Sequence, residues 1–326
     1  MRVVTETGLR EMRSVAFTED CVIELIDQRS LPWYLSTFRC YDSEDTAFAI
    51  KEMVVRGAPA IGATAAYGLA QAWVNGEDLD EAESRLRAAR PTAKDPFTAI
   101  DYTKMGDDLI ERSKEYVESV VKECREIGKH GSELIEDGDR ILTHCNAGAL
   151  ATVDWGTALA PLRVAKRDGK EIFAWVDETR PKMQGALTSW ELENEEIAHR
   201  VIVDNAAGFF MERKEVDLVI VGADRVTRNG DVINKIGTYE KALLAKENEI
   251  PFYVAFPSST LDNTLERGEE VEIEERNGNE IKEAGIEDLK MPLYPGYVKV
   301  KNPAFDVTPR KLITGYITEE GLKNRL

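Results

Sequence analysis

Short apolar runs alternate with helical segments in the second part of the chain, and this alternation most constrains the fold. The predicted strands cover residues 140–143, 172–176, 201–203, 216–221 and 252–255, with predicted helices at 156–164, 206–211 and 236–246. Strands that are separated by helices run parallel, because each helix carries the chain back across the sheet. The pattern therefore predicts an α/β fold with a doubly wound, mostly parallel, Rossmann-like sheet.

The N-terminal part of the chain has a different pattern. Short apolar runs such as 21–26, bounded by turn-prone residues, predict a small antiparallel sheet, and residues 97–126 have strong helical periodicity. A further helix is expected to begin at Ser43. We therefore predict two domains: 1–129, mainly helical with a small antiparallel sheet, and 130–326, Rossmann-like.

The charge balance limits the partners that the protein can have. The chain has 326 residues and a formal net charge of -18, so its surface repels nucleic acid and anionic membranes. No apolar run is long enough to span a bilayer, and the four cysteines form no CxxC pair, which argues against a zinc site or a disulfide framework but leaves one bridge open. We expect a cytoplasmic protein, in which a phosphate ligand requires a local basic pocket.

Three polar clusters directly follow predicted strands. They are residues 144–148, residues 177–180 with Gln184 shortly after, and Asp224. Ligands of open α/β sheets bind beyond the carboxyl ends of the strands, so the position of these clusters predicts a site there.

Cys145 and Asp224 each allow two interpretations. Cys145 is either a buried structural thiol or a functional thiol activated by a nearby helix N-terminus. Asp224 either caps a turn or pairs with Arg225, or it is a carboxyl group that a water-poor pocket keeps protonated as an acid, which we favour. His144 and His199 are expected to be hydrogen-bonded neighbours of strands rather than bases.

The segment 55–62 combines an arginine with small residues. Gly57 and Pro59 interrupt one helix and allow another to begin, and the free N–H groups of a first helical turn can hold an anion. Close packing of helices through small side chains explains the same residues equally well. Arg56 and Arg90 are candidate phosphate ligands, with surface ion pairs as the alternative.

Several motifs together resemble the methylthioribose-1-phosphate isomerase family. They are Val55-Arg56-Gly57-Ala58-Pro59-Ala60-Ile61-Gly62, Thr143-His144-Cys145-Asn146-Ala147-Gly148, Asp177-Glu178-Thr179-Arg180-Pro181, Gly222-Ala223-Asp224-Arg225 and Asn234-Lys235-Ile236-Gly237-Thr238. The similarity extends from about residue 27 to residue 309, almost the whole chain. The same superfamily contains the regulatory subunits of eukaryotic translation initiation factor 2B.

The resemblance implies an aldose–ketose isomerase of methionine salvage that acts on 5-methylthioribose 1-phosphate. It implies Asp224 as the proton donor and Cys145 as the second catalytic residue. The implied substrate-binding residues are Arg56, Gly57, Ala58, Arg90, Gln184, Asn234 and Lys235. Enzymes of this family are usually homodimers and use no metal or nucleotide cofactor.

Two departures from the family pattern leave alternatives open. After Arg90 the sequence continues into Lys94-Asp95-Pro96 where the family usually has Val-Asn-Leu, and residues 184–188 are one residue shorter than usual. These departures put the group on C5 of the sugar in question, so the alternatives are an isomerase of 5-deoxyribose 1-phosphate or ribose 1,5-bisphosphate. The superfamily adds a further alternative, a non-catalytic regulatory subunit. A regulatory subunit requires neither Cys145 nor Asp224.

Overall fold

The computed structural model describes residues 1–5, 7–90, 95–286 and 289–326. These residues form two compact units. Unit 1 is Met1–Arg125 with Ala147–Gly156, and unit 2 is Glu126–Asn146 with Thr157–Leu326. The division expected between residues 129 and 130 stays a prediction. Of the departure at Lys94-Asp95-Pro96, Lys94 lies outside the described residues, and Asp95 and Pro96 belong to the first turn of α4.

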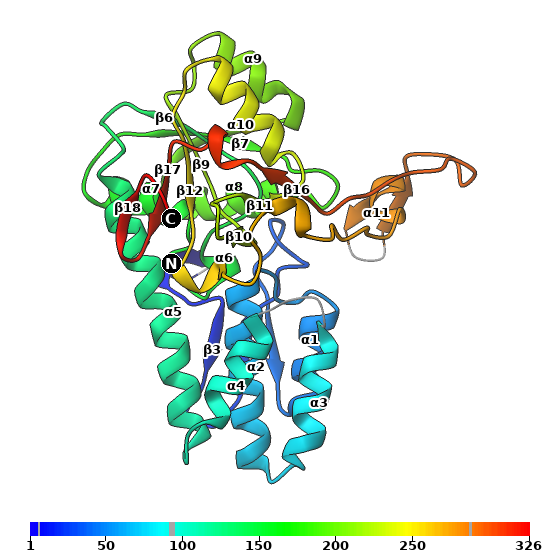
Figure 1. Ribbon diagram of the computed structural model, residues 1–326. Helices are drawn as coiled ribbons and strands as arrows, with labels where there is room; N and C mark the ends of the chain where they lie inside the picture. The colour runs from blue at the N-terminus through cyan, green and yellow to red at the C-terminus, as the bar shows by residue number, and fades with distance from the viewer. Residues whose placement is uncertain (6, 91–94, 287–288) are drawn as a thin grey trace. The chain divides into compact units, whose positions relative to one another are not determined.

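Unit 1 is mainly helical and carries a small antiparallel sheet, β3-β4-β5. Its elements are the hairpin β1 (Arg2–Thr5) and β2 (Gly8–Glu11), the strands β3 (Val15–Phe17), β4 (Ile23–Ile26) and β5 (Thr37–Cys40), and the helices α1 (Ser43–Lys51), α2 (Ala58–Asn75), α3 (Leu79–Ala89), α4 (Asp95–Lys104), α6 (Ala149–Thr152) and most of α5 (Leu109–Ser132) (Figure 1). The helical stretch expected at 97–126 is in fact two helices, because the Asp108 carboxylate caps a new helix by accepting from the N–H groups of Ile110 and Glu111.

Helix α2 is the centre of unit 1. Most of its residues are small and fully buried, which lets neighbouring helices approach closely. A Cβ added at Gly68 lies 2.6 Å from Thr46 of α1 and 3.2 Å from Leu86 of α3, so glycine is needed for this packing. The small-residue interpretation of this segment is therefore supported for the body of the helix.

Unit 2 contains a seven-stranded sheet in the order β18-β17-β12-β9-β6-β7-β8. The strands are β6 (Arg140–Thr143), β7 (Phe173–Asp177), β8 (Ala198–Ile202), β9 (Leu218–Val221), β12 (Phe252–Ala255), β17 (Gly315–Thr318) and β18 (Gly321–Lys323). All neighbours are parallel except β17 and β18. The chain runs outward from β6 to β8, returns to β9 beside β6, and continues to β12 and β17. The predicted doubly wound, mostly parallel sheet is confirmed.

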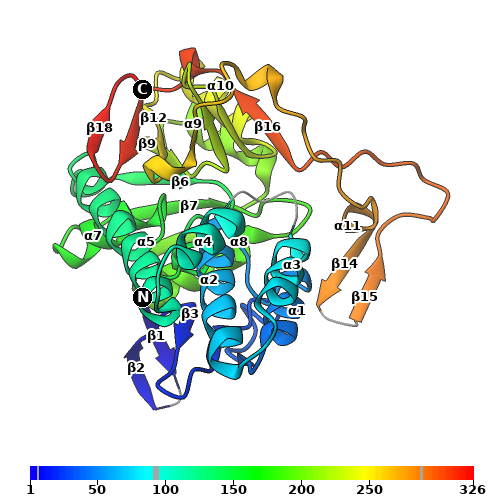
Figure 2. The same cartoon turned by 60° about the horizontal axis from the view of Figure 1, so that its bottom comes forward.

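Helices cover both faces of this sheet (Figure 2). On one face, helices α9 (Ala207–Glu212) and α10 (Thr238–Glu247) share a core with β9 and β12. The 3₁₀ turn η1 (Asp204–Ala206) directly precedes α9. The first two crossovers run in the opposite direction and place α7 (Leu159–Arg167) and α8 (Gln184–Asn194) on the other face. This winding leaves the carboxyl ends of β6 and β9 open at the centre of the sheet.

A second sheet follows Asp224 directly. It has the order β13-β10-β11-β16, and its strands are β13 (Leu261–Asp262), β10 (Arg225–Thr227), β11 (Val232–Lys235) and β16 (Phe305–Thr308). The predicted turn at Asn229-Gly230 closes the hairpin of β10 and β11, with Gly230 at a φ of +87°. The helix expected from Ile236 begins two residues later, because Asn234 and Lys235 belong to β11.

The remaining elements of unit 2 are short. They are the 3₁₀ turns η2 (Ser258–Thr260), η3 (Gly268–Glu270) and η4 (Arg310–Leu312), the helix α11 (Asn279–Lys282) and the hairpin of β14 (Glu283–Ile286) and β15 (Leu289–Pro292). Among the described helices, none is both long enough and apolar enough to cross a membrane.

Candidate functional site

Cys145 and Asp224 lie just beyond the ends of two neighbouring strands. Cys145 follows β6 and Asp224 follows β9, and these strands pair in parallel with Ile141 opposite Leu218. The strand order reverses between β6 and β9, and such a reversal is where open α/β sheets bind ligands. Both side chains therefore belong to the edge of the sheet at which the sequence predicted a site.

The backbone of Cys145 is held in an unusual conformation. Its φ is +69°, a left-handed value that is uncommon for residues other than glycine. The Cys145 N–H donates to Thr179 Oγ1 at 2.9 Å, and Thr188 Oγ1 donates to the Cys145 carbonyl at 2.7 Å. The side chain is a partly buried thiol that forms no disulfide with another described cysteine. Strained residues that are held by their surroundings in this way cluster at functional sites.

A buried ion-pair network supports the residue after Cys145. Asn146 Nδ2 donates to Glu191 Oε1 at 2.9 Å, and the other Glu191 oxygen pairs with Arg163. Arg163 Nε also lies 3.4 Å from Glu195, and all three charged side chains are buried. A charge at this depth is stable only when it is paired, so the network fixes Asn146 to helices α7 and α8.

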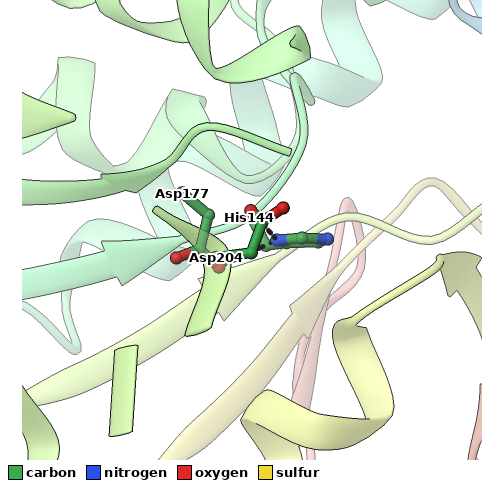
Figure 3. A group of neighbouring side chains, drawn as sticks. All are labelled: His144, Asp177 and Asp204. Carbon is green, nitrogen blue, oxygen red and sulfur yellow. Dashed lines mark hydrogen bonds and ion pairs between the residues drawn. The ribbon is translucent and has the colours of Figure 1, made fainter. Parts of the chain in front are cut away.

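His144 is fully hydrogen-bonded inside unit 2. Its Nε2 lies 2.8 Å from the carbonyl of Ile236, and its Nδ1 lies 2.8 Å from Asp177 Oδ2 (Figure 3). A carbonyl only accepts, so Nε2 carries a proton and donates to Ile236. Burial raises the pKa of Asp177. The Lys241 ammonium, also buried, lies 3.6 Å from Asp177.

Asp204 completes a group of three possible metal ligands, with His144 and Asp177 (Figure 3). One ligand atom from each residue lies within 4.8 Å of the others. However, both nitrogens of His144 are already hydrogen-bonded, and the Asp204 carboxylate accepts from the N–H groups of Thr179 and Arg180 at 2.7 and 2.8 Å. The group therefore acts as a hydrogen-bond network that fixes the loop after β7.

Asp224 is exposed, unlike the residues around His144. Its N–H donates to the carbonyl of Ile233 at 3.0 Å, which joins it to the β10–β11 hairpin. The neighbouring Arg225 forms an ion pair with Asp262 at 3.4 Å. Because the Asp224 side chain is exposed, the described residues alone do not provide the water-poor pocket that was expected around it.

Asn234 and Lys235 lie at the end of β11, where hydrogen bonds fix the turn into α10. Asn234 is buried and donates to Thr238 Oγ1 at 3.0 Å. Lys235 Nζ donates to the carbonyl of Ala304 at 3.0 Å and lies 4.6 Å from the centre of the Phe305 ring. These contacts hold an amide and an ammonium group in fixed positions at the beginning of the helix.

Gln184 is the first residue of α8. Its Oε1 is buried and has no hydrogen-bond partner among the described residues. A buried acceptor without a partner is rare in native proteins, and a functional contact is one explanation of it. The adjacent Gly185 packs against the end of β7: a Cβ there lies 2.1 Å from the Asp177 carbonyl oxygen.

The remaining four candidate residues belong to unit 1. They are Arg56, Gly57 and Ala58, from the motif at 55–62, and Arg90. Arg56 Nη2 donates to the Gln28 carbonyl at 3.1 Å, and Ala58 begins α2. Gly57 has a φ of +93°, and a Cβ there lies 2.4 Å from both Cα and O of Ala151, so only glycine fits. Arg90 lies at the C-terminal end of α3 and is partly buried.

Sequence reasoning missed several residues that hold the site. Thr179 lies in one of the recognised motifs, but its contact with Cys145 depends on two loops meeting. Glu191 and Lys241 gave no signal, because charged residues on helices usually face solvent. Their burial depends on the packing of α8 and α10 against the sheet.

The fold and the strand-end site define a Rossmann-like α/β protein with a largely helical N-terminal unit. Residues 54–324 match the model of the Initiation factor 2 subunit family, and the chain belongs to this family. A relative from Methanocaldococcus jannaschii, described as a putative methylthioribose-1-phosphate isomerase, is 50% identical over 319 residues, covering 96% of this chain and 95% of that protein. The methylthioribose-1-phosphate isomerase of Thermotoga neapolitana is 47% identical, with 92% of each chain covered.

Solved structures show the same similarity. The 5-methylthioribose 1-phosphate isomerase from Pyrococcus horikoshii has a TM-score of 0.88 and 39% identity, covering 96% of this chain and 92% of that chain. A structure described as translation initiation factor eIF-2B, subunit delta, from A. fulgidus has a TM-score of 0.85 and 42% identity, with 96% of each covered. The resemblance stated from the motifs is confirmed.

Proposed function

We propose that this chain is an aldose–ketose isomerase that converts 5-methylthioribose 1-phosphate to 5-methylthioribulose 1-phosphate in methionine salvage. The observation that carries the proposal is 47% identity, over 92% of the chain, to the methylthioribose-1-phosphate isomerase of Thermotoga neapolitana. The positions of Cys145 and Asp224 beyond adjacent strands support it, because they provide an acid and a second reactive group at one edge of the sheet.

The first chemical step opens the sugar ring. The phosphate is on the C1 oxygen, so the ring cannot open by ordinary mutarotation. In our proposal Asp224 protonates the ring oxygen while the bond from C1 to that oxygen breaks. Asp224 is exposed, so the bound sugar itself has to displace water from the carboxyl group before it can act as an acid.

The second step moves hydrogen from C2 to C1. The hydrogen leaves C2 either as a proton, through an enol, or as a hydride that passes directly to the electron-poor C1. In both routes C1 becomes a CH₂ group that keeps its phosphate, and the C2 hydroxyl loses its proton to become the ketone. We assign Cys145 to this step, as the group beside C2 and C1.

The remaining candidate residues bind the substrate. We assign Arg56 and Arg90 to the phosphate, together with the first turn of α2 that begins at Ala58, because guanidinium groups and free helix N–H groups both suit a dianion. Gly57 permits the backbone conformation of that turn. The proposed ligands of the sugar oxygens are Gln184, Asn234 and Lys235.

A panel of three substrates tests the proposal: 5-methylthioribose 1-phosphate, 5-deoxyribose 1-phosphate and ribose 1,5-bisphosphate. We expect ketose formation from the first at the highest kcat/KM. Preference for either of the others identifies a related isomerase instead. Absence of turnover with all three favours a regulatory subunit, the alternative suggested by the description of the A. fulgidus structure. A homodimer, which the resemblance implies, and a cytoplasmic location, which the composition predicts, stay predictions.

A further inference from the structure

His144 connects two loops that carry candidate site residues. It precedes Cys145 at the end of β6, and its Nε2 donates to the carbonyl of Ile236, which follows Lys235. One hydrogen bond of 2.8 Å therefore joins the neighbour of the candidate catalytic thiol to the neighbour of a candidate substrate ligand. We propose that His144 is a positioning residue that sets the distance between Cys145 and the Asn234–Lys235 turn. The inference rests on the proposed function for the roles of these residues.

Each loop also has anchors of its own. Thr179 and Thr188 hold the backbone of Cys145. On the other side, the Asp306 carboxylate accepts from the N–H groups of Gly237 and Tyr239 at 2.7 and 3.0 Å. Losing the bond from His144 to Ile236 therefore leaves both loops attached to the sheet but changes their position relative to each other.

The packing around the His144 ring leaves the two loops little freedom to change their relative position. A Cβ added at Gly237 lies 3.1 Å from Cε1 and 3.2 Å from Nε2 of the ring, and Gly237 has a φ of +99°. Any side chain here displaces the ring or the turn. The glycine thus allows the turn to approach His144 closely enough for the hydrogen bond.

Charged groups on several elements hold the ring in place. Asp177, at the end of β7, binds Nδ1, and Lys241 of α10 lies 3.6 Å from the same carboxyl oxygen. Asp204 lies 4.0 Å from Nδ1, and Asp306 of β16 accepts from the N–H of Gly237, which packs against the ring. The ring is therefore fixed at both nitrogens by groups that unit 2 buries or partly buries.

Two amide substitutions test the two hydrogen bonds of the His144 ring one at a time. Glutamine reaches the position of Nε2, so His144→Gln keeps a donor for the Ile236 carbonyl. Asparagine reaches only the position of Nδ1, so His144→Asn keeps a group beside Asp177 and loses the link to Ile236. His199→Asn is a matched control, because His199 is also hydrogen-bonded at both nitrogens, to Ser189 and to the Ile197 carbonyl, on the edge strand β8.

Steady-state kinetics on folded protein give the first readout. We expect His144→Asn to lower kcat/KM by roughly tenfold to a hundredfold, the scale of a misplaced reacting group, while His144→Gln and His199→Asn stay within about threefold of the unsubstituted protein. Equal losses for His144→Gln and His144→Asn, or no loss for either, overturn the proposal. If His144→Asn does not fold, a loss of tenfold or more in folded His144→Gln also overturns it.

A second readout needs no substrate, so failure of the proposed function is distinguishable from failure of this inference. In a Cys21→Ser background the other two thiols, Cys40 and Cys124, are buried, and iodoacetamide alkylation of Cys145 can be followed by peptide mass spectrometry. We expect His144→Asn to change the alkylation rate by about threefold or more and His144→Gln to restore it. An unchanged rate in His144→Asn contradicts the inference, even if the protein turns over no sugar phosphate.

Discussion

Cys145 and Asp224 follow two strands, β6 and β9, that are neighbours in the sheet but are separated by three crossovers in the chain. The reversal of strand order between them brings together two residues that are far apart in sequence. This arrangement depends on the direction in which the sheet is wound. The winding places the polar residues that follow β6 and β9 next to each other, and hydrophobic periodicity alone does not predict this proximity.

The candidate catalytic residues can be tested without disturbing the fold. We expect Asp224→Asn and Cys145→Ala each to lower kcat by at least about a hundredfold, the scale of a lost general acid or base. Because Asp224 is exposed, Asp224→Asn should leave the melting temperature unchanged. Asp168→Asn is the matched control, an exposed aspartate at the C-terminal end of α7, and should keep full activity. Activity that survives in both site variants contradicts the assignment.

The buried ion pair behind Asn146 should be important for stability. Arg163→Met leaves the buried Glu191 without its cationic partner, while Glu195 keeps its pair with Arg167, so we expect a loss of about 3–5 kcal/mol in the free energy of unfolding, measured by urea denaturation. Lys129→Met is the control: its surface pair with Glu126 should contribute no more than about 1 kcal/mol. Equal losses in the two variants contradict the role of the network.

The pair of Arg140 and Asp217 makes the stability of unit 2 depend on pH. Arg140 Nε and Nη2 both donate to the Asp217 carboxylate at 2.8 Å, joining the beginning of β6 to β9, and this hydrogen bonding lowers the pKa of Asp217. Stabilisation from a lowered pKa is complete above the ordinary aspartate pKa of about 3.9 and is lost as the pH falls through the folded-state value. Asp217→Asn should therefore melt at a lower temperature than the unsubstituted protein at pH 7.

The difference between the two proteins should begin to shrink as the pH falls below about 4, where the unfolded state takes up a proton, and should vanish below the lowered folded-state pKa, where both proteins carry a neutral group at this position. Both groups are about one-third exposed, so the difference at pH 7 should be modest. Melting curves between pH 7 and pH 3 measure it. A difference that grows on acidification contradicts a lowered pKa of Asp217 in the folded protein.

Gly57 should tolerate substitution less well than a glycine in open space. Alanine at Gly57 costs about 1–2 kcal/mol for its positive φ, and its Cβ also collides with the backbone of Ala151, adding about 1–3 kcal/mol. Gly76→Ala is the matched control, with a φ of +72° and no atom within 4 Å of the added Cβ, so it should lose only the first of these. Equal melting temperatures for the two variants contradict the close packing at Gly57.

The sequence was most informative about elements with a clear hydrophobic period. The strand at 140–143 was predicted with its observed bounds, and the helices α7, α9 and α10 were predicted in type, whereas α8 was missed. The sheet of β10, β11, β13 and β16 was missed, because two of its strands are only two or three residues long and one lies some 70 residues further along the chain. Short strands with distant partners carry little local signal.

The candidate site residues that could be predicted from the sequence are those that follow apolar strands or lie in recognised motifs. Cys145 and Asp224 could be located because they follow apolar strands, whereas the positive φ of Cys145 and the burial of Lys241 depend on tertiary packing. The water-poor pocket around Asp224 was expected from the chemistry and is not observed at that exposed side chain. The reaction requires an acid in a water-poor environment, but the residues around Asp224 determine whether the protein alone provides that environment.

The most direct test of the central claim is a proton NMR assay of purified protein with 5-methylthioribose 1-phosphate. The account predicts that the C1 proton signal of the substrate disappears, that signals of the 5-methylthioribulose 1-phosphate product appear, and that Asp224→Asn abolishes this conversion. Unchanged substrate after prolonged incubation with the folded, unsubstituted protein would contradict the claim.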